Sequence, residues 1–156
     1  MSKKEGPVER FNFEEAYRKF LVPFPKEALK ARPSRGMTLT SVSAQYIVER
    51  LNETVGIDGW SHRGAYSVLE VGADKYVVFE GSLLLDNGDK SIMQSSAGSA
   101  KLINNISDAY KTAKTESLSK CASLFGIAND VFKGLVAPPG SSSGPRAVKS
   151  TATGDF

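Results

Sequence analysis

Two segments near the start of the chain place apolar residues at the spacing of an amphipathic helix. The first, residues 12–21, begins at Asn12, a residue type that caps helix N-termini, and ends before the prolines of VPFP. The second, residues 41–55, ends at Gly56, where a left-handed C-cap is expected. Between them the basic segment 26–36, KEALKARPSRG, follows neither period and is predicted to be an irregular connector.

Three segments with the alternation of β-strands follow, over residues 60–71, 75–86 and 90–97. In the second, one face carries four large apolar side chains with a glycine among them: Val77, Phe79, Leu83 and Leu85 around Gly81. The sequences VGAD and DNGD separate the segments, and both are typical of hairpin turns. The pattern predicts an antiparallel three-stranded meander.

Helical spacing returns after Gly98 and predicts a long helix as far as about Phe125. Its apolar stripe consists of Leu102, Ile106, Ala109, Tyr110, Ala113, Ser117, Cys121 and Leu124. Residues 127–135 form a short apolar cap, and residues 137–156 are rich in Pro, Gly, Ser and Thr. We therefore expect one α+β domain over residues 12–136, with two N-terminal helices and a β-β-β-α core whose long helix packs on the meander. Residues 1–11 and 137–156 are expected to be disordered.

Charge is distributed unevenly along the 156 residues, although the net charge is only +3. Residues 1–36 carry nine Lys and Arg against five acids, whereas residues 37–97 carry four against eight. Basic ends favour an anionic partner, although solvated surface lysines give the same totals. No run reaches the roughly 18 uncharged apolar residues of a membrane helix, and the single cysteine offers no disulfide framework. We expect a cytoplasmic protein without a membrane partner.

Catalytic and cofactor motifs are absent from the sequence. His62 is the sole histidine and has no acidic neighbour, and no GxxxxGK[ST] or GxGxxG phosphate loop occurs. Cys121 and Trp60 are interpreted as core residues. We predict a protein that is not an enzyme and needs no cofactor or metal; a metal-dependent nuclease, assembled from acids at turns and strand ends, stays open as an alternative.

Lysines of the predicted long helix are candidates for binding a phosphate backbone: Lys101, Lys111, Lys114 and Lys120. The connector adds Lys30, Arg32 and Arg35. At about 100° per residue, Lys114 lies near −60° and Lys120 near 180° from Lys111. These lysines therefore form no single stripe, and a groove requires a neighbouring element or subunit.

Four segments together resemble the single-strand annealing proteins of the Rad52 superfamily, most closely the bacterial and phage branch that contains the damage-response protein DdrA. They are FLVPFPKEALKARP, RLNETVGIDGW, KYVVFEGSLLLDNGDK and DAYKTAKTESLSKCASLFGI, and the likeness spans residues 17–133. The resemblance implies a β-β-β-α core, assembly into a homo-oligomeric ring or helical filament, and a basic groove that holds single-stranded DNA. It also implies annealing of complementary strands without ATP and without cleavage.

Carrying the family's basic residues over gives only a partial set. In the family, the helix before the glycine-tryptophan turn carries a basic residue; the matching position here is Tyr46, with Arg50 one turn later. The aromatic residue that follows the turn glycine in the family is replaced here by Ile57. Of the basic residues late in the long helix only Lys120 remains, and the lysine at the start of that helix corresponds to Lys101. The predicted DNA-binding residues are Arg32, Tyr46, Arg50, Arg63, Lys101, Lys111, Lys114 and Lys120.

The sequence therefore predicts an ATP-independent protein that binds and anneals single-stranded DNA in recombination and repair. A single-strand binding protein or a recombinase is a further expected partner, and the expected host is a bacterium or a phage. A double-stranded RNA-binding module, which shares the α-β-β-β-α order, and a ring-forming structural protein also stay open at this point.

Overall fold

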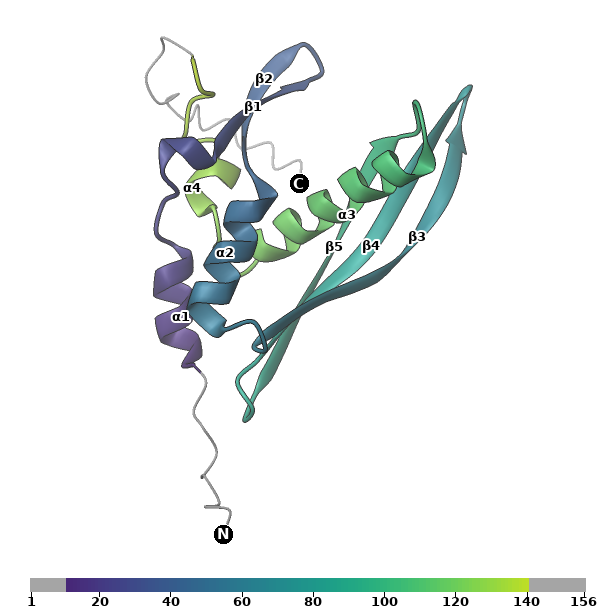
Figure 1. Ribbon diagram of the computed structural model, residues 1–156. Helices are drawn as coiled ribbons and strands as arrows, with labels where there is room; N and C mark the ends of the chain where they lie inside the picture. The colour runs from purple at the N-terminus through teal and green to yellow at the C-terminus, as the bar shows by residue number, and fades with distance from the viewer. Residues whose placement is uncertain (1–10, 141–156) are drawn as a thin grey trace.

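The computed structural model describes residues 11–140, in which two separate antiparallel sheets are combined with helices (Figure 1). The helices are α1 (Phe13–Phe20), α2 (Ala44–Val55), α3 (Ile106–Ser123) and α4 (Asn129–Phe132), with a short 3-10 helix at Lys26–Ala28. The strands are β1 (Leu29–Ser34), β2 (Met37–Val42), β3 (Trp60–Val71), β4 (Asp74–Asp86) and β5 (Ser91–Lys101). Of the ends that were predicted to be disordered, only Phe11 and residues 137–140 lie within the described part.

Strands β3, β4 and β5 form the predicted antiparallel meander in the order β3-β4-β5. Pairing of Val71 with Asp74 leaves a two-residue turn, and Gly72 has a φ of 62°, the positive value that a type II′ turn needs at its first central residue. The turn between β4 and β5 is held by Asn87, whose side-chain oxygen accepts the N–H groups of Asp89 (3.0 Å) and Lys90 (2.7 Å). The meander is confirmed.

Helix α3 crosses one face of this sheet over β4 and β5, as predicted (Figure 1). Two glycines permit the close approach. A Cβ atom on Gly98 would lie 2.0 Å from the carbonyl oxygen of Ala113, and one on Gly81 would lie 2.3 Å from Ser117 Oγ. The backbone of α3 therefore rests almost directly on β5, which fixes the height of its polar face above the sheet.

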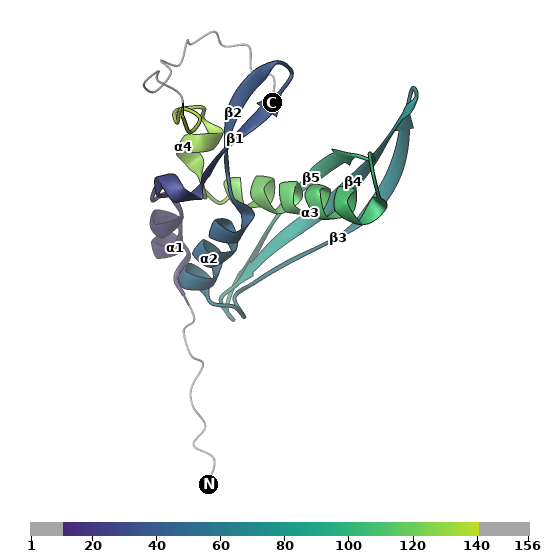
Figure 2. The same cartoon turned by 45° about the horizontal axis from the view of Figure 1, so that its top comes forward.

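The segment predicted to be an irregular connector is instead ordered, and that prediction is wrong. Residues 29–42 form the hairpin β1–β2, with Leu29 paired to Val42 and Ser34 to Met37. Its turn residues Arg35 and Gly36 have φ values of 49° and 75°, as a type I′ turn requires. In Figures 1 and 2 the hairpin extends as an arm beside the C-terminal half of α3. The predicted start of the second helix near residue 41 also lies in this hairpin, because α2 begins at Ala44.

The start of the long helix also differs from the prediction. Residues 98–101 continue β5, with Lys101 paired to Tyr76, and α3 begins only at Ile106. Asn105 caps α3 by accepting the N–H of Asp108 at 2.9 Å, which ends the irregular segment after the strand. Lys101 therefore lies at the end of a strand rather than on the helix.

Two apolar clusters hold these elements together. The larger joins α1, α2, α4, the C-terminal half of α3 and the end of β4, around Phe20, Ile47, Leu51, Leu83 and Leu85. Trp60 packs against it and donates its indole N–H to Asn52 Oδ1 at 2.7 Å, which confirms the structural interpretation of this residue. The smaller cluster lies under the N-terminal half of α3 and consists of Val77, Phe79, Ala109 and Ala113. In the predicted stripe, Ile106 and Leu124 are exposed instead.

Within residues 11–140, no element covers the sheet face opposite α3 (Figures 1 and 2). Side chains alternate along each strand, so Leu69 and Val71 of β3 share that face with Met93 of β5. All three are at least half exposed. The meander thus has one face packed on α3 and one open face with apolar residues.

Candidate nucleic-acid interface

A groove of about 710 Å³ lies between the β1–β2 hairpin and α3 and is bounded on its other side by the α4 region. Its cationic side chains are Lys30 and Arg32 from β1 and Lys111 and Lys120 from α3. Its hydroxyl side chains are Thr38, Thr40, Ser41 and Ser43 from the hairpin side and Thr112, Thr115 and Ser119 from α3. Leu39, Phe132 and Val136 supply an apolar wall. Such a surface offers many donors for a polyanion.

The helical phase of α3 explains why two distant lysines share this groove. Thr112, Thr115 and Ser119 line its middle, and Lys111 and Lys120 lie about 90° to either side of that line at about 100° per residue. They form no stripe, but they flank one. The neighbouring element that this arrangement requires is the hairpin, which brings Arg32 across from α3.

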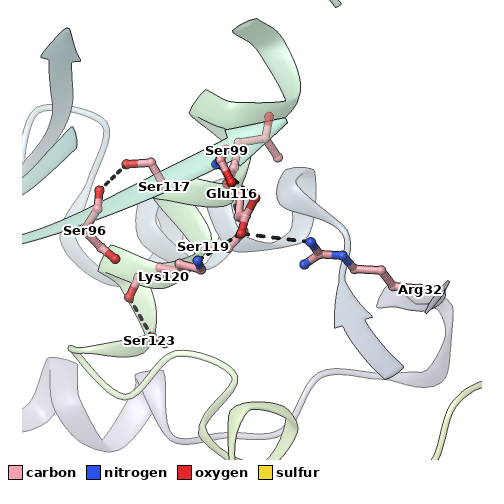
Figure 3. A network of polar contacts seen from close by, with 9 residues as sticks. Arg32, Ser96, Ser99, Glu116, Ser117, Ser119, Lys120 and Ser123 are labelled. Carbon is pink, nitrogen blue, oxygen red and sulfur yellow. Dashed lines mark hydrogen bonds and ion pairs between the residues drawn. The ribbon is translucent and has the colours of Figure 1, made fainter. Parts of the chain in front are cut away.

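One carboxylate organises the cations of the groove. Glu116 Oε1 is 2.9 Å from Lys120 Nζ and 4.0 Å from Arg32 NH2, while Glu116 Oε2 accepts the backbone N–H of Ser99 at 3.2 Å (Figure 3). Glu116 thereby connects β1, α3 and β5. Its side chain is only 16% exposed, whereas that of Arg32 is 55% exposed.

A second, smaller cavity of about 440 Å³ continues from the groove toward the start of α3. Arg32 and Thr112 line both cavities, and Lys101 lines the second. Lys101 Nζ is 3.2 Å from Asp74 Oδ1 across the sheet. Lys101 thus borders the second cavity from the end of β5, but the alternation of the strand directs its side chain to the open face of the sheet, where it meets Asp74.

Arg50 is placed elsewhere and has structural contacts. Its NH1 donates to the carbonyl oxygens of Val22 (2.6 Å) and Lys19 (3.2 Å) at the end of α1, and its guanidinium lies 4.1 Å from the centre of the Phe24 ring. Burial lowers the pKa of Arg50, against the opposing effect of Glu53. These contacts join α2 to the C-terminal end of α1, where a cation also meets the negative end of the helix dipole.

The other predicted residues do not line the groove. Tyr46 lies on α2, and Arg63 lies on β3 and alternates away from the face that carries His62. Lys114 is on the side of α3 near His62, where its charge adds to burial in lowering the pKa of that histidine. Of the eight predicted residues, the structure brings Arg32, Lys111 and Lys120 into the groove and Lys101 next to it.

His62 and Ser117 form a polar contact beneath α3. His62 Nε2 lies 3.1 Å from Ser117 Oγ, and Ser117 donates its single hydroxyl hydrogen to the carbonyl oxygen of Ser96 at 2.8 Å (Figure 3 shows the Ser117–Ser96 bond). His62 Nε2 must then be the donor to Ser117, so this hydroxyl is held as a structural link. Cys121 is buried nearby, and its pKa is raised by that burial. His62, Ser117 and Cys121 therefore all belong to the packing between α3 and the sheet.

Two further findings concern metals and membranes. Among residues 11–140, His, Cys, Asp and Glu side chains form no cluster of three or more that could hold a metal ion. No helix in this range combines the length and the apolar character needed to span a membrane.

Sequence reasoning missed Glu116 and the hydroxyl side chains of the groove, and it named Lys30 only as part of a connector expected to be irregular. The available signal was the sequence MTLTSV after Arg35-Gly36, which alternates in part and follows a pair of residues suited to a tight turn. Read as a hairpin, it would have brought the basic connector into a defined element.

Comparison with known proteins gives one family. Residues 12–133 match the family model described as Rad52/22 family double-strand break repair protein. This match spans every helix and strand described above, from α1 to α4. The match is to the family as a whole, so the assignment to the DdrA-like branch stays a prediction. No curated protein matches the chain.

Proposed function

Because the chain belongs to the Rad52/22 family of double-strand break repair proteins, we propose that it binds single-stranded DNA and anneals complementary strands. Family membership supports a role in DNA repair and recombination. It favours this function over that of a double-stranded RNA-binding module, a nuclease or a purely structural protein. We propose the groove as the DNA-binding site because Arg32 from β1 and Lys111 and Lys120 from α3 converge there.

In this proposal the groove holds the sugar-phosphate backbone and leaves the bases free. Arg32, Lys111 and Lys120 contact phosphates, with Lys30 as a further cation, and the hydroxyl side chains of α3 and β2 donate additional hydrogen bonds. Backbone contacts carry no sequence information, as annealing of arbitrary sequences requires. Base pairing itself supplies the free energy of the reaction, so no ATP and no cofactor is needed. Arg32 and Thr112, which line both cavities, extend the path into the second one.

Self-association is the second part of the proposal. The open face of the meander exposes Leu69, Val71 and Met93, which supports contact with another copy of the chain. Serial grooves in a ring or filament would hold a long strand extended. Mass photometry at working concentration tests this part, and a strictly monomeric protein would contradict it. Tyr46, Arg63 and Lys114 remain predicted DNA contacts outside the groove of one subunit, whereas the hydrogen bonds of Arg50 to the end of α1 favour a structural role for it.

The salt dependence of single-strand binding tests the groove. Affinity for an oligo-dT strand should fall linearly with salt on logarithmic axes, with a slope of about −0.7 for each phosphate contact. Lys111→Ala or Lys120→Ala should weaken binding and reduce that slope by about 0.7 each. Lys90→Ala is the matched control, because Lys90 is exposed in the turn between β4 and β5, at the end of the sheet opposite Lys101, and lines neither cavity. Equal weakening by all three variants would contradict the proposed site.

A further inference from the structure

We infer that Glu116 is a built-in competitor of the DNA phosphates, which holds the groove's cations in place and limits how tightly a strand is retained. This inference rests on the proposed function, because it concerns the same groove. It assigns a role to an acidic residue where a site for a polyanion is expected to carry only cations and neutral donors.

The charge pattern of the groove identifies Glu116 as exceptional. Among the described residues that line the groove, four are cationic and Glu116 is the single acid. On α3 it lies between the line of Thr112, Thr115 and Ser119 and the flanking Lys120. It contacts both Arg32 and Lys120, which approach from opposite sides (Figure 3). A carboxylate between two cations occupies the position that a phosphate oxygen would take.

Glu116 has a preorganising effect when no strand is bound. Without an anion between them, Arg32 and Lys120 would repel each other and spread over many rotamers. The carboxylate draws both toward one point, so a phosphate that arrives there finds its partners already gathered. The exposed Arg32 and the longer 4.0 Å contact mark the side on which exchange begins.

The backbone of β5 keeps the carboxylate in the groove after exchange. Glu116 Oε2 accepts the N–H of Ser99, so the side chain is held from a second direction and cannot swing freely into solvent when Arg32 turns toward a phosphate. The negative charge then stays close to the bound backbone and repels it. The result is a strand that is held and released readily, as annealing requires.

The variant Glu116→Gln tests this inference because it removes the charge and keeps an amide oxygen that can accept the Ser99 N–H. We expect it to bind oligo-dT about three- to tenfold tighter than the wild type, mainly through slower dissociation. At saturating protein we expect slower annealing. Glu49→Gln is the matched control, since it makes the same change of charge at an exposed position of α2 that does not line the groove; its affinity should stay within about twofold of the wild type.

Glu116→Asp separates charge from shape. It keeps the negative charge at a shorter reach, so it should bind no tighter than the wild type. Binding by the wild type without a gain in Glu116→Gln would overturn this inference alone, and so would an equal gain in Glu49→Gln or Glu116→Asp. A Glu116→Gln protein that is destabilised and binds more weakly would also overturn it, because Glu116 would then be only a structural link. Absence of binding in every variant, wild type included, would overturn the proposed function itself.

Discussion

Replacement of Arg50 by alanine should lower the free energy of unfolding, because this side chain fastens α2 to the end of α1. The change removes the hydrogen bonds from NH1 to the carbonyl oxygens of Val22 and Lys19 and the stacking of the guanidinium on Phe24. It leaves three carbonyl groups near the C-terminal end of α1 without this donor, counting the longer 3.5 Å contact to Phe20.

The expected magnitude follows from these contacts. Hydrogen bonds from a charged donor contribute about 1.5–3 kcal/mol each when buried, and a cation–π contact at an exposed site adds about 0.5–1 kcal/mol. Arg50 is only partly buried, and water can replace part of what is lost, so we expect a total loss of about 2 kcal/mol. For a domain of about 130 residues this corresponds to a fall in Tm of roughly 6–8 °C.

Thermal and urea unfolding measure this loss at one protein concentration. Arg18→Ala is the control, because Arg18 is an exposed arginine of α1; it should shift Tm by less than about 2 °C, as surface substitutions do. Well below its Tm, Arg50→Ala should bind single-stranded DNA within about twofold of the wild type. A variant with unchanged Tm that loses DNA binding would refute this reasoning and support Arg50 as the predicted DNA contact.

Three further outcomes follow from the packing of α3. Gly98→Ala should cost about 3 kcal/mol, because its Cβ would lie 2.0 Å from the carbonyl oxygen of Ala113; urea midpoints measure this, and a variant as stable as the wild type would contradict the close crossing. Burial, and after it the charge of Lys114, lowers the pKa of His62 below its ordinary value of 6.5. As the pH falls below 6.5 the unfolded chain therefore binds a proton before the folded protein does, and the free energy of unfolding decreases until the lower pKa of the folded state is passed. The wild type should therefore lose more stability between pH 8 and pH 5 than His62→Gln, whereas parallel curves would count against this assignment. Cys121 is buried with a raised pKa, so a thiol reagent should label it slowly at pH 8 and rapidly in urea; equal rates would show that the site is open.

The sequence was sufficient for the meander and for the body of the long helix. In β4, a strict alternation places Val77, Phe79, Leu83 and Leu85 on one face, and all four are buried. The asparagine-glycine turn after it restricts the connection to a tight hairpin. Where one face of an element is buried and the other is not, the pattern of apolar residues determines both its type and its orientation.

The β1–β2 hairpin could not be predicted in this way because it has no buried face. Most of β1 is exposed, so its side chains show no alternation, and Pro33 argues against a strand. Its turn uses Arg35 at a positive φ, a conformation that arginine rarely adopts. β1 is stabilised by its pairing with β2, and such pairing depends on two segments together, so the pattern within one segment does not reveal it.

The site was predictable only in part for the same reason. Lys111 and Lys120 were identified as phosphate-binding candidates, but the surface that joins them is completed by Arg32 from the unpredicted hairpin. Arg50 was indistinguishable from a solvated arginine, since its partners are backbone carbonyl groups about 30 residues earlier in the chain. Contacts between a side chain and a distant backbone leave no periodic signal in the sequence.

The most direct test of the central claim is the rate of annealing of two complementary oligonucleotides by the purified protein, without ATP or metal. Fluorescence energy transfer between labelled strands follows duplex formation. We predict acceleration over the spontaneous rate, a large loss of that acceleration in the triple variant Arg32→Ala, Lys111→Ala, Lys120→Ala, and retention of the acceleration in Lys90→Ala. Duplex formation by the wild type at the spontaneous rate would contradict the proposed function.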